Sequence, residues 1–437
     1  MGLPAHRNWV LLANWFDATL GMRTAFAFEL GARLGVPYTP SFHFVELYMN
    51  GRYDGLYLLT EHRQVCPLGV GAPGRPQVFY ENRGWMVEFD FRWHDEDEDP
   101  KFRTRNFNLP LVIKGAPNSV SIDGHTYTFR EGHDYTNQDT RNFVVSQWNE
   151  LTDLMAASTF PDNGYRELID MDAIIKYFMV QVIANNVDFF LPHNPNDWRS
   201  HPGSVFWHRR DGDSRIAAGP LWDFDLSFGS FIATTLNTNS SSFYRNNPAL
   251  RLLGPEQRPW PNYPFFARFL QDPVFLARWV ELWFENRDII GSMVYWIDET
   301  ATRIRPYAIR NYARWRVRQD HGNNVDFDWW VQQMRDYTVT RLAFLDNVYS
   351  QYISGVKETT LCNLAIFPSV FANVVNVVSA GKGATVQVFD ITGTLVHTEN
   401  IYFINHHPLQ LGHLPAGVYF FRFEQNGNTR TMRAIKQ

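Results

Sequence analysis

The chain has 437 residues, too many for one small domain, and its length fits a large domain followed by a smaller one. Hydrophobic residues make up 45% and charged residues 19%, so the composition indicates a globular protein and excludes a disordered one. A net charge of −5 argues against a general nucleic-acid-binding protein, which would need a basic face. No apolar run is long enough for a transmembrane segment.

The first predicted element is helical. Apolar residues recur at helical spacing from Trp9 to Leu34, and Gly35-Val36-Pro37 ends this run. Asp17 and Arg23 interrupt the pattern, and we interpret them as a surface or partly buried ion pair that supports the fold. The sequence therefore predicts helix over residues 9–34.

A hairpin and two further strands follow. Phe42–Met49 and Tyr53–Glu61 alternate in polarity and are joined by Asn50-Gly51, a strong hairpin signal. Trp85–Asp90 and Leu109–Lys114 are the next two predicted strands.

Several charged residues lie on or between these strands. Lys114 is either a solvated strand end or a point charge that meets phosphate. Glu88 and Asp90 alternate with apolar residues, so they are expected to share a face, with the solvent side favoured. The run Asp95-Glu96-Asp97-Glu98-Asp99 is typical of a solvated loop and lacks the glycine and final glutamate of a calcium loop.

The central segment places three aspartates near the ends of regular elements. A helix predicted over 170–186, with Asp170 as its N-cap, ends just before Asp188. After an irregular stretch, strands are predicted over 204–209 and 215–221, and Asp223 and Asp225 follow directly.

This arrangement suits phosphoryl transfer. The reaction needs one carboxylate to orient or deprotonate the acceptor hydroxyl, and others to hold a metal ion on the phosphates. Aspartates at strand ends and helix caps are also common for structural reasons, and both interpretations stay open on the residues alone.

The rest of the body is predicted to be helical. Helices are indicated over 142–160, from Pro273 behind an N-cap at Asp272, over 289–312 and over 327–352. The tryptophans and tyrosines in these helices favour core packing over a sugar-binding platform. Seven short strands separated by turn signals then predict a small β-sandwich, over 364–367, 374–379, 384–389, 394–400, 407–411, 417–424 and 429–436.

The words N-N-V-D-F-F around Asp188, G-P-L-W-D-F-D-L-S-F-G around Asp223, and Y-M-N-G-R-Y-D-G-L-Y-L-L-T-E-H in the hairpin resemble the CotH family of atypical, spore-coat-type protein kinases. The resemblance implies an α+β fold, with a kinase-like body over 5–352 made of a truncated β-rich lobe and a helical lobe. A linker over 353–363 and an all-β sandwich over 364–437 complete the expected domains.

The resemblance also implies a site and its cofactors. Asp188 would be the catalytic residue, and Asp223 and Asp225 would hold Mg²⁺ or Mn²⁺. Ser204 occupies what resembles a third metal-binding position, for which Asn194 and Asn196 are alternatives. ATP would be the phosphoryl donor, bound by Lys114 and Glu61, although Glu61 is equally consistent with an edge-strand carboxylate in water.

The C-terminal words N-L-A-I-F-P-S, V-Q-V-F-D-I-T-G-T-L-V and L-P-A-G-V-Y-F-F-R-F resemble the C-terminal sorting domain of the type IX secretion system. This resemblance implies export to the medium or the outer cell surface, with the type IX machinery as a partner and a protein as the unknown substrate. An accessory β-sandwich without a sorting role is the alternative.

The start of the sequence leaves a further alternative open. Met1-Gly2-Leu3-Pro4 lacks the basic start and apolar region of a secretory leader, and the strands with an R-G-x-S-S word that usually open the CotH domain are missing. The nucleotide lobe is therefore expected to be incomplete, either because the chain is part of a longer protein or because it is a decayed relative. A non-catalytic surface scaffold is the second function, and a carbohydrate-binding or carbohydrate-degrading surface protein the third.

Overall fold

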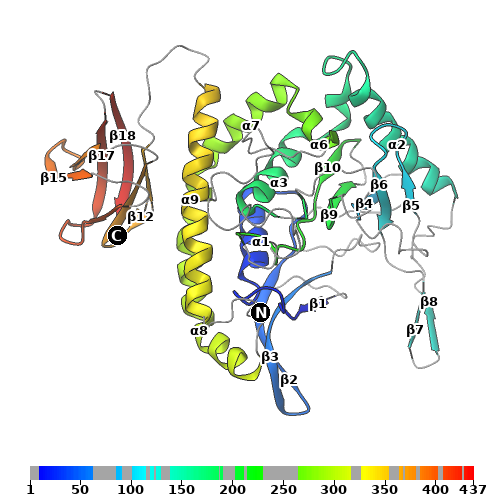
Figure 1. Ribbon diagram of the computed structural model, residues 1–437, viewed down its shortest axis with the longest axis horizontal. Coiled ribbons are helices and arrows are strands. Elements are labelled where there is room, and N and C mark those ends of the chain that lie inside the picture. The colour runs from blue at the N-terminus through cyan, green and yellow to red at the C-terminus, as the bar shows by residue number, and fades with distance from the viewer. Residues whose placement is uncertain are drawn as a thin grey trace, which may run out of the picture.

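A computed structural model of the chain contains α-helices, several antiparallel sheets and a strand-rich C-terminal segment, which confirms the α+β class (Figure 1). The likeness of the body to the two lobes of a kinase stays a prediction, as does the domain division. The structure describes residues 9–62, 85–90, 101–114, 119–122, 125–128, 138–186, 188–189, 202–210, 214–229, 264–315, 326–353, 364–367, 370–379, 384–401, 407–425 and 428–437.

The N-terminal segment is a strand followed by a helix, so the helix predicted over residues 9–34 is wrong in its first half. Strand β1 (Trp9–Leu12) pairs antiparallel with β3 (Arg52–Glu61), and helix α1 spans Met22–Leu34. Asn14 and Leu20, between the two elements, have φ values of 52° and 55°, which are left-handed and interrupt a helix. Apolar spacing did not reveal this turn, because strand and helix both present their apolar residues to the same core.

Asp17 and Arg23 form a fully buried ion pair, whereas a surface or partly buried pair was expected. Asp17 Oδ1 lies 3.1 Å from Arg23 Nη1, and the two side chains are 0% and 2% exposed. The Asp17 carboxylate also accepts backbone N–H groups of Thr19 at 2.8 Å and Gly21 at 3.0 Å. It therefore stabilises the turn that leads into α1, whose N-cap residue, Gly21, has no side chain to do so.

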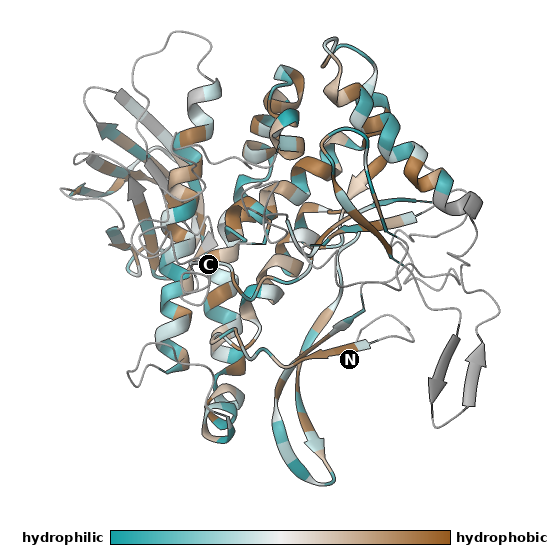
Figure 2. Cartoon of the chain, turned by 45° about the vertical axis from the view of Figure 1, so that its right-hand side comes forward, coloured by the Kyte–Doolittle hydropathy of each residue, from teal (hydrophilic) through white to brown (hydrophobic). Residues whose placement is uncertain are grey.

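The predicted hairpin is confirmed. Strands β2 (Phe42–Met49) and β3 pair antiparallel around Asn50-Gly51, both of which have positive φ, as a primed turn requires. The sheet order is β1-β3-β2. Hydrophobic and hydrophilic residues alternate along the two hairpin strands (Figure 2).

A second sheet has five strands in the order β10-β9-β4-β6-β5, and all its pairings are antiparallel. One of its faces packs against Trp148 and Phe265, whose rings contact Trp207 on the sheet. The strands are β4 (Trp85–Phe89), β5 (Lys101–Arg103), β6 (Pro110–Lys114), β9 (Val205–Arg209) and β10 (Ile216–Ala218). A separate pair is formed by β7 (Ser119–Ile122) and β8 (His125–Thr128).

The expectation that Glu88 and Asp90 face solvent is wrong. Glu88 is 3% exposed and Asp90 is 6% exposed. Alternation along a strand shows which residues share a face, but here both faces of the sheet are covered, so the polar face is also buried. The acidic run 95–99 lies outside the described residues.

The helices agree with the sequence pattern more closely. Asp170 accepts the backbone N–H of Ala173 as the N-cap of α3, and Asp272 accepts that of Val274 as the N-cap of α7. Helix α8 continues through Pro306 without a break. Seven α-helices occur among the described residues: α1, α2 (Gln138–Ala156), α3 (Met171–Ala184), α6 (Pro264–Phe269), α7 (Pro273–Glu285), α8 (Arg287–Arg314) and α9 (Phe327–Ile353), with a short 3₁₀ helix at Tyr165–Leu168.

The predicted C-terminal strands are confirmed, with one further strand. They form a three-stranded sheet in the order β11-β13-β16 and a five-stranded sheet in the order β12-β18-β17-β14-β15. These strands enclose a core of their own, which includes Val386, Leu409 and Phe421 and is separate from the core of the body. The bounds are β11 (Leu364–Phe367), β12 (Val370–Phe371), β13 (Val374–Ser379), β14 (Ala384–Phe389), β15 (Leu395–Ile401), β16 (His407–Gln410), β17 (Gly417–Gln425) and β18 (Asn428–Lys436).

The far end of α8 holds the hairpin through polar contacts. The Asn311 side-chain oxygen accepts the backbone N–H of Leu56 at 2.9 Å, and the contact is buried. A Cβ added at Gly55 would lie 2.9 Å from that same oxygen, so glycine at this position permits the close approach of strand and helix. Arg310 adds an ion pair with Glu46 at 3.0 Å.

We expect Asn311→Ala to destabilise the body by about 1–3 kcal/mol, because it leaves the buried N–H of Leu56 without an acceptor. Differential scanning calorimetry of the full chain measures the shift in melting temperature. Arg303→Ala, at an exposed position of the same helix, is the control. Equal shifts in the two variants would show that the contact does not stabilise the hairpin.

Candidate functional site

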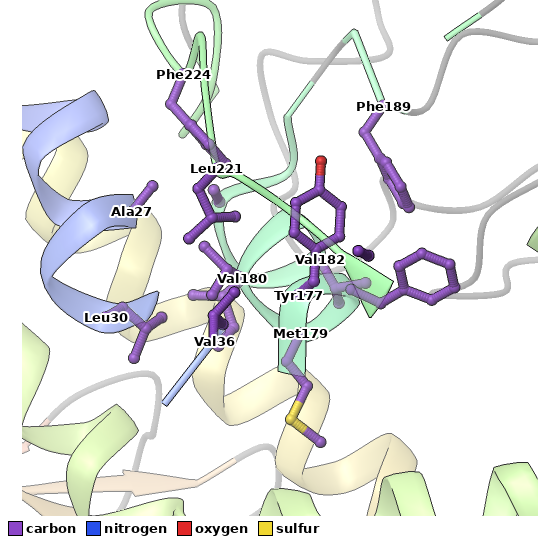
Figure 3. Close-up of a cluster of buried hydrophobic side chains, with 14 of the residues drawn as sticks. Ala27, Leu30, Val36, Tyr177, Met179, Val180, Val182, Phe189, Leu221 and Phe224 are labelled. Atoms are coloured by element: carbon purple, nitrogen blue, oxygen red, sulfur yellow. The ribbon is translucent and has the colours of Figure 1, made fainter. Parts of the chain in front are cut away.

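Three aspartates meet where two segments leave the core of the body. Asp188 follows the end of α3, and Asp223 and Asp225 follow β10. All three side chains are half-buried, whereas the neighbouring Phe189 and Phe224 are fully buried. Figure 3 shows Phe224 and Leu221 on the side of α1, and Phe189 beyond Tyr177 of α3.

Buried phenylalanines hold the segments that carry the carboxylates against the core. In the run Trp222-Asp223-Phe224-Asp225 the central ring is buried, and the aspartates on either side are half-buried. Burying one phenylalanine side chain stabilises the fold by roughly 1.5–3 kcal/mol, which holds the segment in place.

Asn186 connects the two acidic segments. Its side-chain nitrogen donates to the Asp223 carbonyl at 3.2 Å, and its side-chain oxygen accepts the Asp188 backbone N–H at 3.4 Å. Asn186 is 1% exposed, and both bonds are partly buried. One buried amide therefore fixes the spacing between the backbones that carry Asp188 and Asp223.

Helix α9 holds the C-terminal end of α3 in place. Arg341 of α9 is fully buried and donates from Nε and Nη2 to the Val182 carbonyl at 3.1 Å. Asn185 adopts φ 50° as the helix C-cap, and its side chain donates to the Tyr337 hydroxyl at 2.9 Å. Asp188 thus follows a helix end held by two contacts with α9.

Ser204 and Asp223 share a hydrogen bond and an unusual backbone. The Ser204 hydroxyl donates to Asp223 Oδ2 at 3.1 Å. Ser204 has φ 53° and Asp223 has φ 61°, and non-glycine residues adopt such values only when their surroundings enforce them. Two of the predicted metal-binding residues are therefore in direct contact.

The carboxylates repel one another. Burial and the nearby Asp223 charge raise the pKa of Asp188 to about 8. Burial, and then repulsion by Asp223, Asp188 and Asp17, raise the pKa of Asp225 to about 8, although Arg23 partly offsets this shift. Like charges at a half-buried site raise pKa values because protonation removes the repulsion.

The donor set suits a hard divalent cation. Carboxylate and hydroxyl oxygens are the ligands that Mg²⁺ and Mn²⁺ take, and a cation would relieve the repulsion among the aspartates. As the side chains stand, no group of three His, Cys, Asp or Glu residues in the described part of the chain is already arranged to hold a metal ion. The residues fit the ion by chemistry and charge, and metal binding would require their side chains to adjust.

The Lys114 side chain points towards the end of the five-stranded sheet where Ser204 precedes β9. Its ammonium lies 3.0 Å from Glu88 and 3.9 Å from Asp90. Lys114 pairs in register with Met86, so its side chain extends along β4 towards Asp90. Phe89 of β4 pairs with Val205 of β9. Asp90 follows Phe89 and Ser204 precedes Val205, so Asp90 and Ser204 lie at the same end of the sheet.

The structure places the predicted nucleotide-binding residues in two different sheets. Glu61 lies at the end of β3 in the hairpin sheet, where its side chain accepts the backbone N–H of Ser41 at 3.2 Å. Lys114 pairs with Glu88 and Asp90 of the five-stranded sheet. Asn194 and Asn196 lie outside the described residues.

Sequence reasoning missed two contributors. Asn186 was taken only as the end of a helix, and nothing in its spacing indicates a bridge between distant segments. Glu88 was expected in solvent, and its contact with Lys114 depends on strand order, which the sequence does not reveal. The shared face of Glu88 and Lys114 follows once β4 and β6 are known to be neighbours.

Comparisons with known proteins give two matches. A family model described as CotH kinase protein matches residues 1–64 and 113–345. A second, described as a secretion system C-terminal sorting domain, matches residues 365–437. A comparison with curated proteins finds no match.

The two matches agree with the site and with the tail. The first covers Asp188, Ser204, Asp223, Asp225 and Lys114. The second covers the C-terminal sheets, and none of the described helices has both the length and the hydrophobicity to cross a membrane. The chain therefore belongs to the CotH family and ends in a sorting domain of the type IX secretion system, which indicates a secreted or cell-surface protein.

Proposed function

We propose that this protein is a secreted or cell-surface protein kinase of the CotH type. It transfers the γ-phosphoryl group of ATP to a serine or threonine hydroxyl of a protein substrate and uses Mg²⁺ or Mn²⁺. The observation that carries the proposal is the electrostatic coupling of Asp188, Asp223 and Asp225, which come from distant segments and are held by buried groups. Aspartates with only a structural role are rarely placed beside other aspartates, because the repulsion between them lowers the stability of the fold.

Each residue has a distinct role in this proposal. Asp188 orients the acceptor hydroxyl and accepts its proton, for which the carboxylate must be ionised. Asp223, Asp225 and Ser204 would hold the metal ion, which neutralises charge on the phosphates when bound. Lys114 contributes a positive charge from β6 at the same end of the sheet.

Glu88 supports Lys114 in this proposal, in place of Glu61. The 3.0 Å contact holds the ammonium in position before a nucleotide arrives. Glu61 stabilises the hairpin sheet through Ser41. Export through the type IX machinery, for which the sorting-domain match is the support, would bring the kinase to substrates outside the cell.

A non-catalytic scaffold is the second candidate. The observation that favours it is the gap in the family match, which leaves residues 65–112 unmatched and so omits Glu88 and Asp90 beside Lys114. A protein that lost nucleotide binding could keep Lys114 as the structural partner of these two buried acids. The two candidates differ in whether ATP binds.

We expect the chain to bind ATP in the presence of Mg²⁺, and Asp223→Ala to weaken this binding by about 100-fold or more. Loss of even an outer-shell partner of a metal costs about 10–100-fold, and Asp223 is proposed as a direct ligand. Isothermal titration calorimetry with and without Mg²⁺ measures both effects. Asp162→Ala, at an exposed position, is the matched control.

Two results would contradict the kinase proposal. ATP binding that is unchanged in Asp223→Ala would remove Asp223 from the site. Absence of ATP binding in the wild-type chain, with Asp188→Ala and Asp223→Ala changing only thermal stability, would favour the scaffold.

The raised pKa values predict a pH dependence of stability without metal. Asp188 and Asp225 have pKa values of about 8 in the folded protein, above the value of 3.8 that applies to an unperturbed carboxyl. The folded state therefore binds more protons than the unfolded state between these values, and stability falls as pH rises through about 8. We expect the melting temperature in EDTA to fall from pH 5 to pH 9, and Mg²⁺ to restore it most at the alkaline end.

Asp225→Asn is the matched variant for this measurement. It removes one titrating group and part of the repulsion, so its melting temperature should depend less on pH than that of the wild type. Calorimetry at five or more pH values provides the comparison. An equal pH dependence in both proteins would show that Asp225 does not titrate as expected.

A further inference from the structure

We propose that Arg23, held by Asp17, is a positioning residue that fixes the backbone of the acidic segment 223–225. This inference rests on the proposed function, because it assigns to a buried ion pair the task of presenting the metal-binding aspartates. Neither Arg23 nor Asp17 touches the reacting groups. Their effect passes through the main chain of Asp225.

The Asp17–Arg23 pair is fully buried. Asp17 Oδ1 lies 3.1 Å from Arg23 Nη1, with exposures of 0% and 2%. Burying two charges costs more than their attraction returns unless further hydrogen bonds satisfy them. Such a pair stabilises the fold less than apolar residues of the same size would. Its presence therefore indicates a role other than stability.

The remaining hydrogen bonds of the pair join it to the backbone of two segments. Asp17 accepts from the backbone of Thr19, Gly21 and Arg23 at 2.8, 3.0 and 3.3 Å, and from the Thr19 hydroxyl at 2.6 Å. Arg23 Nη1 donates to the backbone carbonyl of Asp225 at 3.1 Å. Asp17 therefore accepts hydrogen bonds from the backbone of its own turn, and Arg23 links this turn to the acidic segment.

The two charges of the pair have opposite effects on Asp225. Asp17 raises the pKa of the Asp225 carboxyl and Arg23 lowers it, and both effects are smaller than those of burial and of Asp223 and Asp188. The pair carries no net charge, so its two fields oppose each other at Asp225. Arg23 acts on the segment mainly through the position of its backbone.

The residues just before the acidic segment and the turn that holds Asp17 are both closely packed. A Cβ at Gly31 would lie 2.3 Å from the Leu221 side chain. Glycine at this position therefore allows α1 to pack closely against the segment that follows β10. Tyr312 of α8 donates to the Ala18 carbonyl at 2.6 Å and anchors the turn that holds Asp17. In Figure 3, Leu221 lies between Ala27 of α1 and Tyr177 of α3.

Two variants test the role of Arg23. Arg23→Lys keeps the charge but replaces the rigid guanidinium, whose Nη1 contacts both Asp17 Oδ1 and the Asp225 carbonyl, with a flexible ammonium. The double variant Asp17→Asn with Arg23→Met removes both charges together, so neither is left buried without its partner, and the asparagine still accepts from the turn. Arg287→Lys is the matched control, because the Arg287 guanidinium also pairs with an aspartate, Asp346, at 2.6 Å.

The readout is Mn²⁺ binding without nucleotide, followed by electron paramagnetic resonance of the free ion, at a temperature well below each melting transition. We expect Arg23→Lys to weaken Mn²⁺ binding about tenfold, as outer-shell partners of metal ligands do, and the double variant to weaken it further. Arg287→Lys should lower the melting temperature and leave Mn²⁺ affinity unchanged.

The outcomes separate the two proposals. Weakened binding in both Arg23 variants, with normal binding in the control, supports the positioning role. Wild-type affinity in both Arg23 variants overturns it and leaves the proposed kinase function standing. A wild-type chain that binds neither Mn²⁺ nor Mg²⁺-ATP overturns the proposed function and this inference with it.

Discussion

The candidate site depends on the burial of two phenylalanines next to three aspartates. Phe189 and Phe224 are fully buried, and their burial holds the segments that carry Asp188, Asp223 and Asp225 against the core. The aspartates are held half-buried at the surface of that core, where water screens their charges only partly. Apolar burial thus offsets a repulsion that would otherwise separate the two segments.

Local signals in the sequence predicted much of the fold. Asn50-Gly51 marks the hairpin, and Asp170 and Asp272 mark the first turns of α3 and α7, because a turn or cap is determined by a few adjacent residues. The C-terminal strands were predicted nearly to their ends for the same reason, since each alternates in polarity and is closed by a turn. The missed strand β12 has only two residues, too few for a pattern.

Features that depend on distant partners were not predictable from one sequence. The first strand of the body pairs with β3, some fifty residues later in the chain, and without this partner its apolar residues were taken as part of a helix. Burial of Glu88 depends on Lys114 from another strand. For the site, the order of the aspartates indicated that they belong together, but the bridge through Asn186 needed coordinates.

The contact between Asn311 and the hairpin has a consequence for the order of folding. Its two partners are 255 residues apart in sequence, and Arg23 and Asp225 are 202 apart. A chain that emerges N-terminus first, from a ribosome or a membrane pore, completes β2 and β3 long before α8 is available to receive them. Until α8 is available, the part of the hairpin that contacts it stays uncovered. Contacts between residues far apart in sequence form slowly and leave the chain prone to aggregation.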